Sequence, residues 1–291
     1  MQHNKKGAAY AALSGLFFGL IGYFGVSVIN ADISVSNMLF WRFLVSGLFI
    51  AILLIPSMKT SLSTTSIWEL FKVTSAGALF YGACSIFYFI AAKYIGSGLS
   101  MVIFFTYPAI VMLINFLFYK QKISKIYYLA ITIIFIGLVF LTHGEGIKFD
   151  VTGIGLSLLS ALLYALYLIA SKSSPVPSLL ATLMVSIGCM VACLIAALMD
   201  NTFKVPLGIN VWFNICGIGI ICTALPIVLL LQGLKYISSV QASILSVLEP
   251  VFVVIFGILL LNETINFIQT LGVLILLSGA LLALLSERQK K

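Results

Sequence analysis

KYISSVQASILSVLEPVFVVIFGILLL, residues 235–261, is an apolar stretch that begins with one lysine and carries one acid, Glu249, near its middle. A helix needs about 20 apolar residues to cross the hydrocarbon core of a bilayer, so this stretch is long enough to span it. A second stretch, KYIGSGLSMVIFFTYPAIVMLINFLFY, residues 93–119, begins with the same three residues and has Pro108 where the first has Pro250. A membrane-length segment that occurs twice indicates a membrane protein with an internal repeat.

The composition places most of the chain in lipid. Of 291 residues, 62% are hydrophobic and 8% are charged, and the mean hydropathy is +1.20. A soluble domain carries about 25% charged residues, so this chain has too few for a water-facing surface. The net charge of +8 forms no basic stripe, which excludes a nucleic-acid partner. The five cysteines lie inside apolar runs and show neither disulfide nor metal spacing.

Ten apolar runs cover the chain, and the first is too long for a cleaved leader. We therefore predict an all-α membrane protein of ten transmembrane helices, five in residues 1–146 and five in residues 147–291. The runs are Ala8–Ile29, Val35–Ile55, Val73–Ala92, Ile95–Tyr119, Ile126–Thr142, Val151–Ser171, Ser178–Met199, Val211–Leu234, Ile237–Leu261 and Ile265–Ser286.

The two halves are predicted to be inverted copies of one another. An offset of 142 residues aligns Gly77 with Gly219, and an offset of 146 aligns Gly7 with Gly153. Because each half holds five spans, an odd number, the second half enters the membrane from the opposite side. Transporters use such inverted repeats to build two gates around one central site, so we expect a central cavity.

The lysines and arginines predict the orientation. Cytoplasmic loops are richer in these residues than outer loops, and an N-terminus in the cytoplasm places eleven of them inside and three outside. Both termini are then cytoplasmic. The inner set is Lys5, Lys6, Lys59, Lys120, Lys122, Lys125, Lys172, Lys235, Arg288, Lys290 and Lys291, and the outer set is Lys93, Lys148 and Lys204.

Glu249 is the leading candidate for a functional residue. It lies twelve residues from each end of the predicted ninth span, and an acid near the bilayer midplane costs about 3 kcal/mol on insertion scales. We expect it to face a cavity, where it binds substrate or exchanges a proton. The alternative is a structural acid that is satisfied by a neighbouring hydroxyl or by Arg42.

Further candidates belong to three groups. Arg42, in the second span, is expected to serve structure or gating, with substrate contact as the alternative. Span tyrosines are expected in a polar pocket, with packed helices as the alternative: Tyr81, Tyr88, Tyr107, Tyr164 and Tyr167. Prolines free backbone carbonyls and kink helices, and the candidates are Pro108, Pro226 and Pro250. Small residues spaced by four permit close helix contacts, and the candidates are Gly15, Gly19, Ala161 and Ala165.

Several short motifs within or beside the predicted spans are informative. They are Trp41-Arg42-Phe43, Lys93-Tyr94-Ile95 with Thr106-Tyr107-Pro108, and Lys235-Tyr236-Ile237 with Leu248-Glu249-Pro250. In this the chain resembles the EamA-type ten-helix members of the drug/metabolite transporter superfamily. The resemblance implies a basket of helices around a central cavity, with Glu249 and the five span tyrosines as lining candidates. It also implies an asymmetric cavity, because the first half has Tyr107 where the second has Glu249.

We therefore expect a secondary transporter that moves a small metabolite (an amino acid or related compound, or a drug) across a bacterial inner membrane by alternating access. Export or exchange is the favoured direction, and protons are among the expected partners. Import by an intracellular bacterium and a non-transporting membrane scaffold are the alternatives. The sequence has no phosphate-binding loop, paired aspartates or histidine cluster, so we expect no enzyme activity, cofactor or metal.

Overall fold

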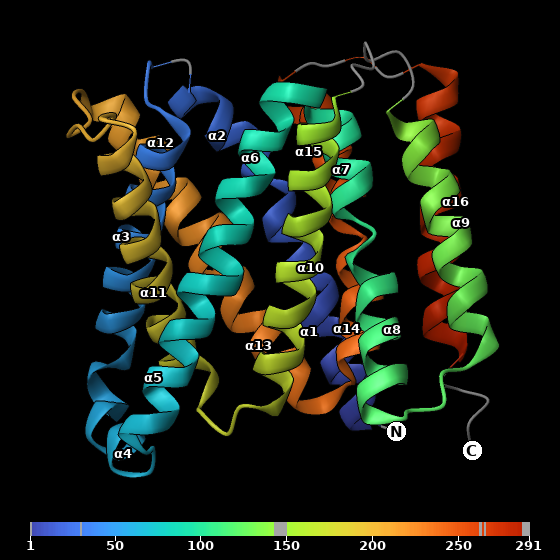
Figure 1. Cartoon of the computed structure of the whole chain (residues 1–291), viewed down its shortest axis with the longest axis horizontal. Coiled ribbons are helices and arrows are strands. Elements are labelled where there is room, and N and C mark those ends of the chain that lie inside the picture. The colour runs from blue at the N-terminus through green and yellow to red at the C-terminus, as the bar shows by residue number, and fades with distance from the viewer. Residues whose placement is uncertain (1, 30, 143–149, 262–263, 265, 287–291) are drawn as a thin grey trace.

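The structure, a computed structural model, describes residues 2–29, 31–142, 150–261, 264 and 266–286, and within these ranges every regular element is a helix (Figure 1). Eight helices among the described residues are long and apolar enough to cross a membrane, and two apolar helices are shorter, Lys125–Leu141 and Phe267–Ala283. The chain is a multi-pass integral membrane protein. The eight are Asn4–Gly25, Val35–Ser63, Ile67–Ile95, Ser97–Tyr119, Val151–Ser173, Ser178–Met199, Ile209–Tyr236 and Ser239–Leu261.

Most of these spans are built from two or more helical segments. In residues 2–141 they are α1 (Gln2–Gly19), α2 (Ile21–Ile29), α3 (Val35–Leu54), η1 (Ile55–Ser57), α4 (Met58–Ser63), α5 (Ile67–Ala76), η2 (Gly77–Gly82), α6 (Ala83–Ile95), α7 (Ser97–Phe104), α8 (Tyr107–Tyr119) and α9 (Lys125–Leu141). In residues 151–286 they are α10 (Val151–Ser173), α11 (Ser178–Met199), α12 (Ile209–Gly219), η3 (Ile220–Ala224), α13 (Leu225–Tyr236), α14 (Ser239–Ser246), α15 (Glu249–Leu261) and α16 (Phe267–Ser286).

Short polar residues start several of these helices. The side chains of Ser34, Asp150 and Ser238 accept hydrogen bonds from backbone amides in the first turns of α3, α10 and α14. Such caps satisfy amides that have no partner within the helix. At the junction of α6 and α7 the chain turns at Gly96, whose φ of +83° favours glycine.

Two spans break in the middle, next to the prolines at matched positions. The fourth span divides into α7 and α8 at Phe105–Thr106, two residues before Pro108. The ninth predicted span divides into α14 and α15 at Val247–Leu248, again two residues before Pro250. Proline cannot donate to the preceding turn, so each span changes from one helical segment to the next at this depth.

Two other spans contain a π-helical segment, at Gly77–Gly82 and Ile220–Ala224. The second segment ends at Ala224, two residues before Pro226, where the sequence predicts a kink. The first has no proline nearby and was not predicted. Its position is set by packing, because a Cβ atom at Gly77 would lie 2.8 Å from the Val185 backbone of α11. Widened helical turns of this kind occur often at functional sites.

The segment boundaries differ from the predicted runs at several places, and the second span continues through η1 and α4 to Ser63, beyond its predicted end at Ile55. The first run is interrupted at Leu20, between α1 and α2, rather than continuing to Ile29 as one helix. The third span begins at Ile67 rather than Val73, so that Glu69 and Lys72 lie inside the helix. These two side chains pair with each other at 2.7 Å, which lets the helix continue through a charged turn.

Contacts at glycines occur in matched pairs across the two halves. A Cβ atom at Gly7 would lie 2.7 Å from Tyr236, and one at Gly153 would lie 2.8 Å from Tyr94. Gly7 and Gly153 are 146 residues apart, and Tyr94 and Tyr236 are 142 apart. The start of α1 therefore packs on the end of α13, and the start of α10 packs on the end of α6, in the same manner.

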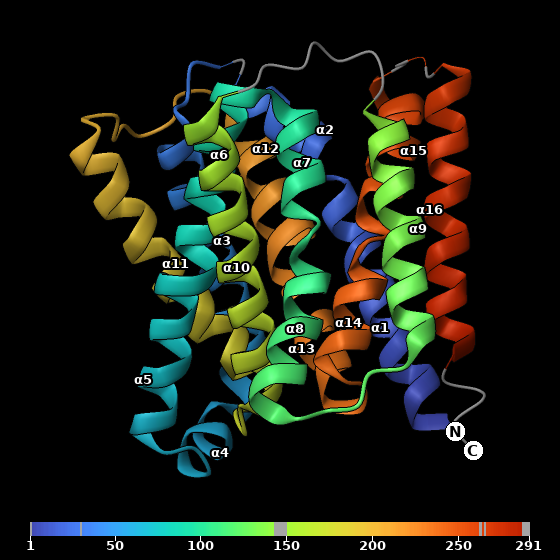
Figure 2. The same cartoon turned by 45° about the vertical axis from the view of Figure 1, so that its right-hand side comes forward.

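The helices α9 and α16 lie side by side along the edge of the bundle (Figure 2). Glycines permit their close approach, because Cβ atoms at Gly137, Gly272 and Gly279 would each come within 3.0 Å of the opposing helix. The start of α1 and the end of α16 lie at the same end of the molecule, here called the terminal face (Figure 1). The end of α6 and the start of α7 lie at the other end, called the opposite face.

Candidate functional site

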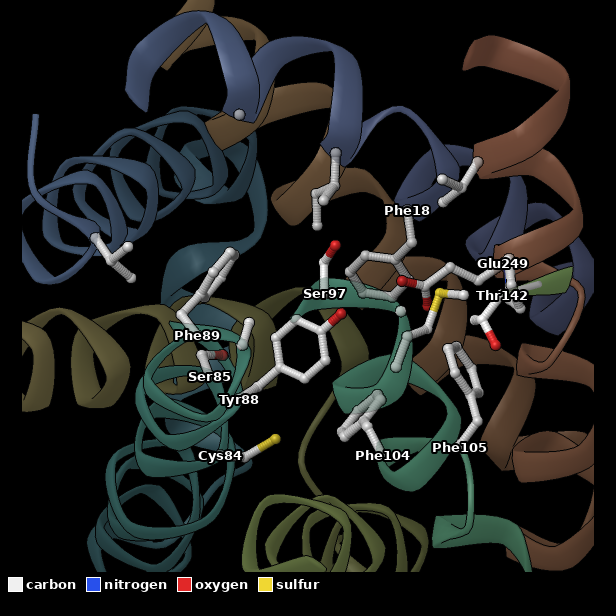
Figure 3. Close-up of a pocket in the computed structure, with 18 of the residues that line it drawn as sticks. Phe18, Cys84, Ser85, Tyr88, Phe89, Ser97, Phe104, Phe105, Thr142 and Glu249 are labelled. Carbon is white, nitrogen blue, oxygen red and sulfur yellow. The ribbon is translucent and has the colours of Figure 1, made fainter. Parts of the chain in front are cut away.

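A cavity of about 890 Å³ lies among the helices and extends to the opposite face. Its lining comes from both halves of the chain, including α1, α2, α3, α6, α7, α10 and α15. At the rim are Lys93, Ser97 and Thr142, which lie at the end of α6, the start of α7 and the end of α9. Both aromatic rings and small polar side chains line it (Figure 3).

Glu249 is the first residue of α15 and points into this cavity, as does Phe18 of α1 (Figure 3). The break before Pro250 places it where the ninth span changes segment. Gly15 brings α1 against this point, because a Cβ atom at residue 15 would lie 3.3 Å from the Glu249 amide nitrogen. Glu249 thus occupies a cavity wall rather than the lipid-facing surface, as an intramembrane acid requires.

Arg42 lines the same cavity from α3 and is 3% exposed. Its Nε donates a hydrogen bond to Thr223 Oγ1 at 2.6 Å, and the guanidinium carbon lies 5.2 Å from the centre of the Phe43 ring. Thr223, within the π-helical segment of the eighth predicted span, donates in turn to the Ile218 carbonyl at 2.7 Å. The buried guanidinium is therefore oriented by one hydroxyl and one aromatic ring.

The two charged side chains do not pair with each other. Over the described residues the one ion pair is Lys72–Glu69, and neither Arg42 nor Glu249 takes part in another. Glu249 also accepts no hydrogen bond from a side chain in that part of the chain. Arg42 is buried and Glu249 is half-buried, and the two line one cavity without an ion pair to any described residue, which is costly unless something else satisfies them.

A layer of tyrosines closes the inner end of the cavity. The rings of Tyr81 and Tyr167 stack with centroids 4.9 Å apart, and Tyr164 lies 5.8 Å from Tyr81 and 6.0 Å from Tyr167. Tyr107 meets Tyr164 edge-on at 4.7 Å. All four side chains are at most 6% exposed. Contacts of this kind stabilise a compact aromatic cluster.

The structure brings together some of the candidates from the sequence and separates others. Glu249, Arg42, Tyr81, Tyr88 and Tyr164 line the cavity. Tyr107 does not, because its hydroxyl donates to the Ser243 carbonyl at 3.3 Å and its ring is enclosed by others. Tyr167 lies behind Tyr81, on the side away from the cavity. It lines a second pocket instead.

The predicted packing residues lie at close contacts. A Cβ atom at Gly19 would lie 2.5 Å from the Phe252 side chain, so α1 approaches α15 along the face that Gly15 and Gly19 share. Ala161 and Ala165 are completely buried in α10. The domain boundary at residues 146 and 147 and the predicted cations Lys148, Arg288, Lys290 and Lys291 lie outside the described residues.

The sequence analysis missed several lining residues that helical spacing places beside Tyr81. Cys84 and Ser85 follow it at three and four residues and line the cavity, as does the predicted Tyr88 at seven residues. Residues with this spacing share one face of a helix. Lys93 was assigned to a loop, although it lies at the rim. In the described part of the chain no group of three His, Cys, Asp or Glu side chains is placed to hold a metal ion.

Bundled apolar spans, a pair of broken helices and a cavity among them are typical of membrane transporters. The chain belongs to the EamA-like transporter family, whose profile it matches over residues 5–143 and 151–285. The two matched ranges correspond to the two halves of the chain, and this family indicates a small-molecule substrate and a bilayer environment.

Similar proteins agree with this family. An uncharacterized transporter of Bacillus subtilis (strain 168), YxxF, is 23% identical over 282 residues, which are 96% of this chain and 89% of that protein. An uncharacterized transporter of Archaeoglobus fulgidus is 35% identical over 72 residues, 25% of this chain and 27% of that one. A solved crystal structure, described as that of a protein, shares the fold with a TM-score of 0.82 at 17% identity, over 99% of both chains.

Proposed function

We propose that this chain is a secondary transporter that carries a small zwitterion, an amino acid or a related compound, across the membrane by alternating access. The observation that supports it is the pair of charges in one cavity. Arg42 complements a carboxylate, since a guanidinium forms paired hydrogen bonds to carboxylate oxygens. Glu249 complements an ammonium group or holds a proton. The apolar lining, with Phe18 and Phe104, accommodates an apolar side chain.

Ten spanning helices in two inverted five-helix repeats, residues 1–146 and 147–291, are part of this proposal. The matched contacts of Gly7 on Tyr236 and of Gly153 on Tyr94 support it, as do the paired helix breaks and the paired π-helical segments. In this arrangement the short helices α9 and α16 are the fifth and tenth spans. Such a repeat gives two interconvertible conformations around one site.

The proposed setting is a bacterial inner membrane with the terminal face in the cytoplasm. The described cations at that face support this orientation, because positively charged loops remain inside. The cavity then opens to the outside in the present conformation. Export or exchange is the proposed direction, and a proton bound by Glu249 is the proposed coupling partner.

The test compares wild type with Glu249→Gln by thermal unfolding in detergent. The ligands are an apolar amino acid, the amine that lacks its carboxylate and the acid that lacks its amino group. A ligand at 100 times its Kd stabilises by about 2.7 kcal/mol. We expect the zwitterion to raise the Tm of wild type most, and this shift to disappear in Glu249→Gln. Transport by Glu249→Gln in vesicles at the wild-type rate, with unchanged pH dependence, would show that this role is wrong.

A further inference from the structure

A second pocket, of about 490 Å³, lies at the terminal face on the other side of the tyrosine layer. It is lined by the beginning of α5, the ends of α10 and α13, and the beginning of α11. Lys172 and Lys235 lie at its rim, and Tyr167 lies at its inner end. The cavity described above and this pocket are therefore separated by the stacked rings of Tyr81 and Tyr167.

The lining of the pocket repeats the lining of the cavity, one half of the chain later. Phe89, Ala92 and Lys93 line the cavity, and the residues 142 positions further on line the pocket. The same holds at an offset of 146 for residues of α2 and at an offset of 143 for residues of α3. The matched pairs are Ile21 with Tyr167, Gly25 with Ser171, Val35 with Ser178, Met38 with Ala181, Arg42 with Val185, Phe89 with Leu231, Ala92 with Leu234 and Lys93 with Lys235.

In one further matched pair the assignment is reversed, because the residue of the first half lines the pocket and the residue of the second half lines the cavity. Ala76 of the first half lines the pocket, and Ile218, 142 positions later in the second half, lines the cavity. An exchange of this kind is what a two-fold relation between the halves produces, because it moves each half from one face to the other. Unrelated surface hollows would not share their lining residues in register.

We infer that the pocket is the second mouth of the translocation pathway, closed in this conformation, and that it takes the same small zwitterion from the terminal face. The inference rests on the proposed function and adds the residues of the second route. The cavity is the larger of the two because the opposite face is open. In the alternate conformation the pocket enlarges towards the tyrosine layer and the cavity contracts.

The burial of matched residues agrees with this assignment. In the cavity Phe89 and Ala92 are half-buried, whereas Leu231 and Leu234, their partners in the pocket, are 6% and 1% exposed. The same helix face is thus open in the first half and closed in the second. Lys172 contributes to the closure, since its Nζ donates to the Leu234 carbonyl at 2.6 Å and so links the ends of α10 and α13.

The test uses the full chain with Cys84→Ser and Cys216→Ser, into which the matched pair Phe89→Cys and Leu231→Cys is introduced. Spheroplasts and inverted vesicles, with a tag at the start of the chain to mark the terminal face, expose one face at a time to a membrane-impermeant thiol reagent. We expect Phe89→Cys to react from the opposite face and Leu231→Cys, more slowly, from the terminal face.

The decisive measurement is coupling between the two positions. A bulky adduct at Phe89→Cys holds the cavity open, so we expect it to lower the reaction rate at Leu231→Cys roughly tenfold, as a shift between two conformations requires. Ser63→Cys, exposed at the end of α4 on the terminal face and outside both linings, serves as the control and should not respond. The pair Val35→Cys and Ser178→Cys repeats the measurement if the first pair does not fold.

The outcomes separate this inference from the proposed function. Equal rates at Leu231→Cys with and without the adduct, in a protein that transports an amino acid in vesicles, would overturn the second mouth and leave the transporter assignment intact. Reaction of Leu231→Cys from the opposite face would also overturn it. Coupled rates in a protein that moves no zwitterion would support the two mouths and refute the proposed substrate class.

Discussion

Thr223 shows how one hydroxyl orients a buried charge. Its hydroxyl oxygen accepts a hydrogen bond from Arg42 Nε at 2.6 Å, and the same hydroxyl donates a hydrogen bond to the Ile218 carbonyl at 2.7 Å. Thr223→Val keeps the shape but removes the acceptor, and losing a hydrogen bond to a buried charged group costs about 1–3 kcal/mol. We expect a lower Tm in detergent for Thr223→Val, and a Tm close to wild type for Thr223→Ser. Equal melting of all three proteins would contradict the role assigned to this hydroxyl.

At the same scale, the sequence predicted which polar residues matter better than how they are arranged. Glu249 and Arg42 could be singled out because charges within apolar spans are rare. That they share a cavity without pairing depends on how the bundle places α3 and α15 around the cavity, which no local sequence pattern encodes. Tyr107 and Tyr167 were grouped with Tyr81 by residue type alone. Only the packing reveals that their rings lie away from the cavity.

Among the elements, the contact of α11 with α5 and the π-helical segment η2 depends on Gly188. A Cβ atom there would overlap the Thr74 carbonyl oxygen and come within 2.8 Å of the Ala78 amide nitrogen. Backbone atoms cannot move aside singly, so Gly188→Ala must separate the helices, and such overpacking costs about 1–3 kcal/mol. We expect thermal unfolding in detergent to show a lower Tm for Gly188→Ala.

Gly155→Ala is the matched control for this prediction. Gly155 is exposed on α10, and a Cβ atom there would meet no atom within 4 Å. Alanine favours a helix over glycine by up to about 1 kcal/mol, so this variant should melt at or above the wild-type temperature. A loss of stability equal to that of Gly188→Ala would mean that glycine is needed for flexibility rather than for close contact.

Elements differ in how far the sequence predicts them. Apolar runs and prolines predicted the membrane spans and the breaks near Pro108 and Pro250, because both signals are local. The π-helical segment at Gly77–Gly82 was not predicted, because its widened turn is set by packing against α11 and not by a residue within the segment. The break at Leu20 has no proline either. Extended boundaries, as at Ile67, arise because a paired lysine and glutamate can continue a helix beyond the apolar run.

At the scale of the whole molecule, the two halves place a lysine at each rim, Lys93 at the cavity and Lys235 at the pocket. If each rim serves as a mouth, each lysine attracts the carboxylate of the substrate on its own side. Charges at a rim act mainly on the rate of encounter and are screened by salt. Neutralising one lysine should therefore weaken uptake from one face and leave the other unchanged.

We predict that two single variants affect transport from opposite faces of the membrane. Lys93→Gln should raise the KM for substrate supplied at the opposite face about two- to fivefold at low salt, and Lys235→Gln should do so for substrate supplied at the terminal face. In both variants kcat should stay near wild type, and the difference should shrink at high salt. Vesicles of known orientation, assayed by counterflow from each side, measure both constants. If Lys235→Gln raised KM equally from both faces, the lysine would act on the shared site or on the fold, and the matched lysines would reflect common ancestry of the halves without a common role at the two mouths.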